Sequence, residues 1–199
     1  MKASPLRHEV AALFVLEENM KNRVQKTVCA ALCLALALVL PFLTGQIPQI
    51  GSMLLPMHIP VLLCGFVCGA QWGTAVGLIA PILRSLLFGM PPMFPSAAAM
   101  AAELAAYGLL SGLLYRVLPK KTGSIYVALI AAMLGGRIAW GIVRWIFAGV
   151  QGTGFAFSAF LAGAVTNGVP GIILQIVLVP ALVMALRRAN LIVDLPSER

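Results

Sequence analysis

The sequence predicts an all-α integral membrane protein with six transmembrane helices and with both ends in the cytoplasm. Of its 199 residues, 61% are hydrophobic and only 10% are charged, against about 25% charged residues in an ordinary soluble domain. Apolar runs of about 20 residues, the length that a helix needs to cross a bilayer, recur along the chain. The basic residues gather in short clusters beside these runs, as expected for cytoplasmic flanks that face anionic lipid.

The first three apolar runs are expected to form helices joined by an outer loop and a tight inner turn. Residues 24–43 follow a basic segment, but the run is too long for a signal peptide and no small-residue cleavage site follows it. We therefore expect it to be retained as a helix. Glycine and proline punctuate the loop at 44–53. The second helix is expected at about 54–70, and the third follows a Gln-Trp-Gly turn and ends near Phe88.

The second half of the chain predicts three further helices. Three prolines within residues 89–95 remove backbone donors and restrict the residues before them, so this segment is expected to be an outer loop. A basic turn at 119–123 separates the next two helices. The helices are expected at 96–118, at 124–150 and, after a Gly-containing turn at 151–154, up to about residue 188, with kinks at Pro170 and Pro180.

The positions of the basic residues orient this predicted bundle. Six crossings place both ends and the second and fourth loops on one side, and the three other loops carry no Lys or Arg. The residues on the basic side are Lys21, Arg23, Lys26, Arg116, Lys120, Lys121, Arg187 and Arg188. The positive-inside rule assigns that side to the cytoplasm.

The chain is expected to hold one domain. Residues 20–190 form the predicted six-helix membrane domain, and residues 191–199 form a cytoplasmic tail. Residues 1–19 are a more polar N-terminal extension, and the native chain is expected to start at Met20. N-terminal sequencing of the native protein would test this start.

Charged residues inside apolar runs are costly, and each one predicts a function or a buried partner. They are Arg84, Glu103 and Arg144, which are expected nearer the outer end, and Arg137, which is expected about two turns deeper. His58 and Asn167 are expected at a comparable depth toward the outer side. Arg137, Trp140 and Arg144 share one helix face because they are spaced by three and four residues. An indole flanked by two guanidiniums suits a ligand with an apolar body and an anionic group. Since three arginines face one carboxylate, we expect an outward-facing pocket in which an anionic ligand supplies the missing charge.

Structural explanations compete with this interpretation. Arg84 would pair with Glu103, and Arg144 would extend its guanidinium to the outer interface. His58, which lies between two prolines, is equally consistent with a ligand contact and with a hydrogen-bonded loop residue. Asn167 and Gln175 would form hydrogen bonds between helices. For Gln175 this structural role is the prediction.

No catalytic or metal site is expected, and no cofactor. The cysteines lie in apolar runs at i,i+4 spacing, where a reduced thiol behaves as a small hydrophobic group. They are Cys29, Cys33, Cys64 and Cys68. Ser111 and His58 are expected at opposite sides of the membrane, too far apart for proton transfer. The sequence holds no G-x-x-x-x-G-K-[ST] loop, so ATP hydrolysis would come from other subunits. Because no nucleophile–base pair or metal cluster shares a depth, the chain is not expected to be an enzyme.

Three segments of the sequence resemble a family of membrane transport proteins. The segments are residues 55–65 (LPMHIPVLLCG), 81–92 (PILRSLLFGMPP) and 103–107 (ELAAY), with Gly69, Gly73 and Gly77 between them. On this basis residues 21–190 are similar to the substrate-binding S component of an energy-coupling factor (ECF) vitamin transporter. Among its members they look most similar to the pantothenate type.

The resemblance implies a six-helix protein of the bacterial cell membrane that binds a vitamin in its outer half, beneath the first and third outer loops. It also implies partners, namely a transmembrane coupling subunit and two cytoplasmic ATPase subunits. In this family a small-residue motif on the first helix docks on the coupling subunit, and Ala31 and Ala35, which form a stripe with Thr27, match that motif. The family is also described as toppling in the membrane to release its vitamin inside.

Charge and resemblance together favour a small carboxylated vitamin, with pantothenate as the first candidate. Arg137 and Arg144 would hold the carboxylate, while Glu103, Asn167 and His58 would meet the hydroxyl and amide groups. A different vitamin or a nucleobase-like precursor (a queuosine precursor, hydroxymethylpyrimidine or niacin) is the nearest alternative. A solitary, ATP-independent carrier or channel for a small solute is the second hypothesis, and uptake by this chain alone in vesicles would favour it.

Overall fold

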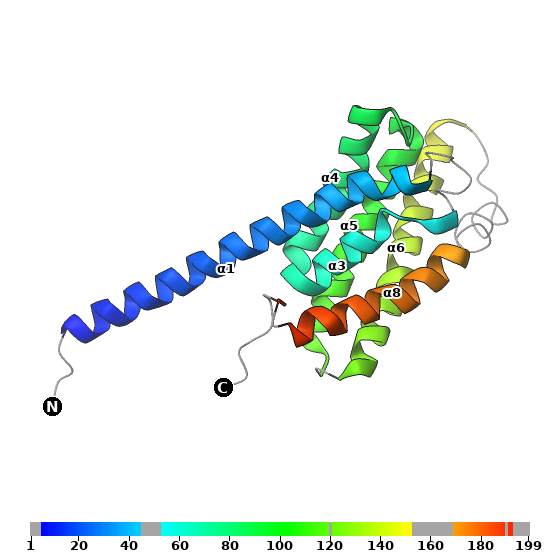
Figure 1. The fold of residues 1–199 in the computed structure, drawn as a ribbon. Helices are drawn as coiled ribbons and strands as arrows, with labels where there is room; N and C mark the ends of the chain where they lie inside the picture. The colour runs from blue at the N-terminus through cyan, green and yellow to red at the C-terminus, as the bar shows by residue number, and fades with distance from the viewer. Residues whose placement is uncertain (1–4, 45–52, 120, 153–168, 190, 193–199) are drawn as a thin grey trace.

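The computed structural model describes residues 5–44, 53–119, 121–152, 169–189 and 191–192, and for residues 5–19 and 44 it describes the backbone alone. Every regular element in these ranges is a helix (Figure 1). The elements are α1 (Pro5–Val39), η1 (Leu40–Thr44), α3 (His58–Cys68), α4 (Ala70–Phe88), η2 (Met93–Ala97), α5 (Ala98–Val117), α6 (Thr122–Val150) and α8 (Val169–Arg188).

Five helical spans in the described part of the chain are long and apolar enough to cross a membrane. They are Met20–Leu43, Ala70–Phe88, Met93–Val117, Thr122–Val150 and Val169–Arg188. Helix α3 is apolar but has only 11 residues, fewer than the roughly 20 that a full crossing requires. The all-helical, multi-pass class is confirmed, whereas six full crossings with both ends in the cytoplasm stay a prediction.

Several helix boundaries differ from the expectation, and one lies outside the described residues. The turn expected at residues 71–73 falls at Gly69 instead, so those three residues belong to α4. Helical structure begins again at Met93 in η2, within the segment expected to be a loop. Helix α1 begins at Pro5 and therefore runs through the segment expected to be a separate extension. Helix α3 begins at His58 rather than near residue 54, because Leu55 adopts a positive φ of 50° and Pro56 follows it in the turn. The first part of the expected sixth helix falls in residues 153–168, outside the described ranges.

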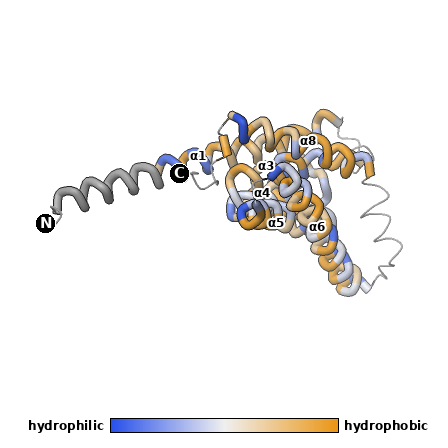
Figure 2. Tube along the Cα trace, turned by 90° about the horizontal axis from the view of Figure 1, so that it is seen from below, coloured by the Kyte–Doolittle hydropathy of each residue, from blue (hydrophilic) through white to orange (hydrophobic). Residues whose placement is uncertain are grey.

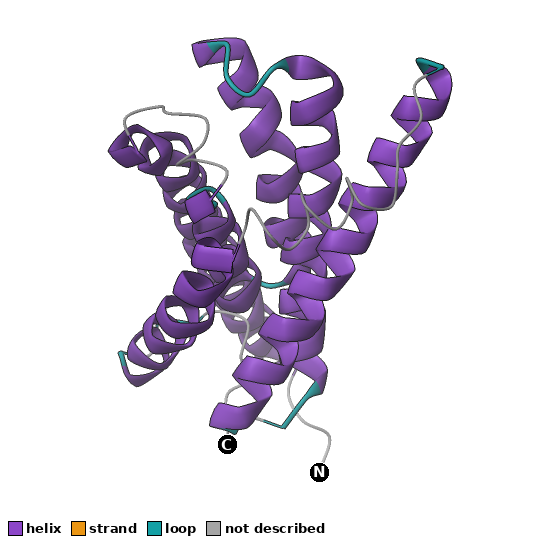
Figure 3. Ribbon diagram, turned by 90° about the vertical axis from the view of Figure 1, so that its right-hand side faces the viewer, coloured by secondary structure: helices purple, strands orange, loops and turns teal. Residues whose placement is uncertain are grey.

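Helix α5 occupies the centre of the bundle. It packs against α3, α4 and α6, while α1 crosses α3 and α4, and α8 lies against α3 and α6. Figure 1 shows that the C-terminal end of α8 lies on the same side of the bundle as the turn from α3 into α4 and the connection between α5 and α6. The start of α3, the start of α8 and the end of α6 lie at the opposite end, which we call the loop end (Figures 1 and 3).

Glycines allow α3, α4 and α5 to approach closely. We call Gly65, Gly73, Gly77, Gly108 and Gly112 the glycine seam. A Cβ atom placed on Gly73 would lie 2.7 Å from the Cα of Gly65 and 2.8 Å from the carbonyl oxygen of Gly108. Contacts this short leave no room for a side chain, and small residues at helix crossings are typical of membrane bundles. The seam therefore fixes α3, α4 and α5 relative to one another. Helices α3 and α5 each carry one residue of the candidate site described below.

The outward faces of the helices are apolar, as lipid contact requires. Large hydrophobic side chains are exposed along α1 and α6, among them Val28, Leu32, Leu134 and Trp145. Figure 2 shows hydrophobic residues along most of the described helices, and a hydrophilic stretch where α1 leaves the bundle. An apolar surface of this extent is unfavourable in water, which agrees with the long apolar spans.

Candidate functional site

The turn before α3 brings a histidine into the interior at the loop end. The backbone N–H of His58 donates to the carbonyl of Leu55 at 3.0 Å, which starts the helix without a capping side chain. The side chain of His58 is 1% exposed, and its ring meets that of Tyr107 edge to face, with centroids 5.2 Å apart. Tyr107 on α5 is fully buried. The imidazole is therefore enclosed by protein rather than held in a surface loop.

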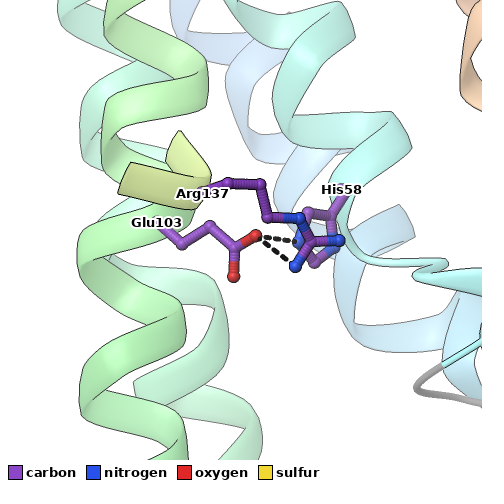
Figure 4. A network of polar contacts seen from close by, with 3 residues as sticks. All are labelled: His58, Glu103 and Arg137. Carbon is purple, nitrogen blue, oxygen red and sulfur yellow. Dashed lines mark ion pairs between the residues drawn. The ribbon is translucent and has the colours of Figure 1, made fainter. Parts of the chain in front are cut away.

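One carboxylate joins this histidine to an arginine from a third helix (Figure 4). Glu103 on α5 is 2% exposed, and its Oε1 lies 2.8 Å from Nη1 of Arg137 on α6 and 3.4 Å from Nε2 of His58. We call these three residues the polar centre. Glu103 is the only acidic residue between positions 20 and 190. Because burial of an unpaired carboxylate is very costly, Arg137 serves as its counter-ion.

The polar centre has more hydrogen-bonding capacity than its own residues use. Among the described residues, Nε and Nη2 of Arg137 and both ring nitrogens of His58 are buried without a hydrogen-bond partner. Leaving such atoms unsatisfied costs about 1–3 kcal/mol for each group. A small molecule with acceptor oxygens would satisfy the arginine donors, and one with a hydroxyl or amide group would also suit the imidazole. The polar centre is therefore a candidate binding site.

Helix α6 continues the site toward the loop end. Trp140 and Arg144 follow Arg137 on one face, and the guanidinium carbon of Arg144 lies 5.9 Å from the centre of the Trp140 ring. Both side chains are partly buried. Gly136, next to Arg137, lies against Tyr107 and the backbone of Glu103, so α6 and α5 approach closely beside the polar centre. The predicted face with an indole and two guanidiniums is present.

Arg84 lies elsewhere, between α4 and the end of α1. Its Nη1 donates to the carbonyl of Leu38 at 2.6 Å, and its guanidinium lies 5.1 Å and 5.4 Å from the ring centres of Phe42 and Phe88. Where α1 passes into the 3₁₀ helix η1, Pro41 has no N–H to donate to Leu38 in the i+3 pattern. The arginine supplies that donor.

The structure thus brings together some of the expected site residues and separates others. His58, Glu103 and Arg137 form the polar centre, Trp140 and Arg144 adjoin it on α6, Arg84 holds α1, and Asn167 lies outside the described residues. The structural alternative in which Arg84 pairs with Glu103 is not what its contacts show. Tyr107 was not expected at the site, and its spacing of four residues from Glu103 was the available signal.

The remaining expectations concern α1 and the cysteines. Ala31 and Ala35 are exposed on α1, on a face that is open to a partner. Cys64 and Cys68 are part of the hydrophobic core, and Cys29 and Cys33 pack against it, all four as free thiols. Within the described ranges no group of three or more His, Cys, Asp or Glu side chains is placed to hold a metal ion.

Comparison with known families gives the chain its place. A family model described as "ECF transporter, substrate-specific component" matches residues 25–183. The chain belongs to this family. As an ECF substrate-specific component, it is a transport subunit rather than an enzyme, and it associates with the transmembrane and ATPase components of an ECF importer. Comparisons with curated proteins and with solved structures find no match.

The matched range includes the whole polar centre and the exposed face of α1. The family match therefore covers the buried nitrogens that have no hydrogen-bond partner among the described residues.

Proposed function

We propose that this chain captures a small carboxylated vitamin, pantothenate in the first place, for uptake by an ECF importer in a bacterial plasma membrane. The observation that carries the proposal is that the guanidinium of Arg137 uses only one of its three nitrogens to contact Glu103. Its Nη1 neutralises Glu103, while its Nε and Nη2 have no hydrogen-bond partner among the described residues. A ligand carboxylate is the group that such a pair of parallel N–H donors binds best.

Charge balance supports an anion over a cation or a neutral ligand. Residues 20–190 place three arginines and one glutamate within apolar helices. Since Arg137 neutralises the glutamate, the interior keeps an excess of positive charge. A carboxylate held between Arg137 and Arg144 would reduce that excess, and the ring of Trp140 between them would cover an apolar part of the ligand.

The other polar residues would meet the body of the ligand. Glu103 and His58 present acceptors and a donor suited to hydroxyl and amide groups, which pantothenate carries. Asn167, which lies outside the described residues, is a further proposed contact of the ligand. Arg84 hydrogen-bonds to α1, so we propose that it fixes the helix beside the site and does not bind the vitamin.

A vitamin panel on detergent-solubilised protein tests the proposal. A ligand at 100 times its Kd stabilises the folded state by about 2.7 kcal/mol, which corresponds to a rise in Tm of roughly 5–10 °C for a chain of this size. We expect such a rise with pantothenate, or else with biotin or niacin, and none with cationic thiamine. A panel in which no carboxylated vitamin raises Tm would contradict the anion-binding function.

Two arginine variants then test the residue assignment. Arg144→Ala should weaken pantothenate binding by about tenfold or more, since a charged hydrogen bond contributes about 1.5–3 kcal/mol. Arg116→Ala is the matched control, because Arg116 is exposed near the end of α5 away from the loop end. Equal pantothenate affinity in the Arg144 variant and the wild type would remove Arg144 from the site.

Docking on the coupling subunit is the second half of the proposal. We propose that Ala31 and Ala35 let that subunit approach α1 closely. Co-expression with an ECF coupling subunit and its ATPases should give a complex that co-purifies, and Ala31→Leu should abolish it. Leu36→Val is the control, because Leu36 is exposed on α1 and, at one residue from Ala35 and five from Ala31, it lies on a different face of the helix. Retention of the complex in the Ala31 variant would contradict this docking face.

A further inference from the structure

Helix α8 carries a buried amide, that of Gln175. Gln175 is 0% exposed, and among the described residues neither its Oε1 nor its Nε2 has a hydrogen-bond partner. A glutamine that linked two helices would use at least one of these atoms. Because an unsatisfied buried amide is unfavourable, its presence requires an explanation other than contact between helices.

The packing of α8 sets the depth of this amide. Gly171 lies against the backbone of Met53 and Leu54, just before α3, and its missing side chain permits the contact. Helices α3 and α8 pack together and run in the same direction from the loop end (Figure 1). Gln175 lies four residues, or about 6 Å, further along α8 from Gly171. The amide is therefore inside the bundle, as is the imidazole of His58 at the start of α3.

The same face of α8 points into the bundle. Gly171, Gln175, Val179 and Val183 are buried at successive spacings of four residues. This face packs against α3 and α6, the two helices that carry His58 and Arg137. Gln175 is therefore on the buried side of a helix that packs against the two helices carrying His58 and Arg137.

We infer that Gln175 is a ligand-binding residue that recognises a neutral group with both a donor and an acceptor, such as an amide, a ureido group or a hydroxyl. The inference rests on the proposed binding function and adds the chemistry of the side opposite the carboxylate. Among the described residues, two donors of Arg137 have no partner, and they suit an anion. The amide of Gln175 carries no charge, so it suits a neutral group instead. An amide side chain forms two complementary hydrogen bonds with a ligand amide. The ligand is then a carboxylate joined to such a group, with the carboxylate toward α6 and the neutral group toward α8.

Gln175→Leu separates this role from a structural one, because the two roles predict opposite changes. If the amide serves the ligand, the apolar variant removes an unsatisfied group and the ligand-free protein keeps or raises its Tm, by about 2–4 °C. Pantothenate affinity, measured by calorimetry on the same protein, falls at least about tenfold, as when a buried polar group of a site loses its partner. If the amide bridges helices, Tm falls and pantothenate affinity stays within about twofold, a result that would overturn the inference.

Two further measurements keep the result interpretable. Val183→Ala changes the same face two turns further along α8, and it should lower Tm without changing pantothenate affinity. Niacin, which has a carboxylate and no amide, should bind Gln175→Leu and wild type alike if it binds at all. Failure of wild type to bind any vitamin of the panel would contradict the proposed function, whereas a lowered Tm of ligand-free Gln175→Leu would contradict the role of Gln175 by itself.

Discussion

The ion pair at the polar centre predicts a strong and non-additive effect on stability. At 2.8 Å between Oε1 of Glu103 and Nη1 of Arg137, two unit charges attract by about 6 kcal/mol at an effective dielectric constant of 20. Removal of one partner of a buried pair costs about 3–5 kcal/mol, because the other charge is left uncompensated. Arg137 is 13% exposed and keeps some access to solvent. We therefore expect Glu103→Gln to lower the free energy of unfolding by about 3 kcal/mol.

The complementary variant and the double variant complete the cycle. Arg137→Met leaves a carboxylate that is 2% exposed, so its loss should be at least as large, at about 3–5 kcal/mol. The double variant Glu103→Gln/Arg137→Met leaves no charge and should be no less stable than either single variant, since apolar replacement of a buried pair is often neutral. Unfolding of the ligand-free protein in mixed detergent micelles, followed by circular dichroism, measures all four proteins.

Additivity in this cycle would refute the reasoning. If the double variant lost the sum of the two single losses, the side chains would be energetically independent despite their distance. Arg137→Met combined with Ser111→Ala is the matched control. Ser111 is buried on α5 about 12 Å along the helix from Glu103, so these two losses should add.

Further predictions concern the glycine seam, Arg84 and Trp140. Gly108→Ala should lower the unfolding free energy by about 1–3 kcal/mol, because its new Cβ meets the backbone of Gly73, whereas Gly149→Ala, with open space around it, should be neutral or stabilising in the same assay. Arg84→Leu should lower the free energy of unfolding by about 2 kcal/mol, the value of a charged hydrogen bond. Vitamin affinity should stay within about threefold of wild type, because sites without shared contacts act independently. A loss of affinity at unchanged stability would instead assign Arg84 to the ligand. Trp140→Leu should weaken binding of the carboxylated vitamin by about tenfold, and Trp145→Leu, on the exposed face of α6, should not.

The class of the protein could be predicted because hydrophobicity and helix breakers are local properties. The expected ends of α4 at Phe88 and of α6 at Val150 agree with the structure, since Gly89 adopts a left-handed conformation and a turn follows Val150. The short α3 was not predicted. Hydropathy scores the apolar run before His58 as helix, while the backbone turn at Leu55 depends on how the chain enters the bundle.

The site could be predicted in composition but not in pairing. Counting residues along each helix placed Glu103 and His58 toward the outer end but Arg137 about two turns deeper, whereas the guanidinium of Arg137 reaches the carboxylate of Glu103. Which arginine meets the carboxylate depends on helix rotation and neighbours, and the contact of α4 with α1 directs Arg84 to a backbone carbonyl instead. The expectation for Gln175 shows the same limit, since a sequence does not reveal whether an amide finds a partner.

The hydrogen bond from Arg84 to α1 bears on how the chain enters the membrane during synthesis. An arginine is costly within a span, most of all at the centre, and Arg84 lies four residues before the end of α4. The carbonyl of Leu38 precedes Arg84 in the chain, so its acceptor is already in the bilayer when α4 arrives. Glu103 is in the reverse situation, since Arg137 is made one helix later. The carboxylate of Glu103 has no counter-ion until α6 has been synthesised. A nascent chain that ends after α5 contains His58 but not Arg137 as a partner for this carboxylate.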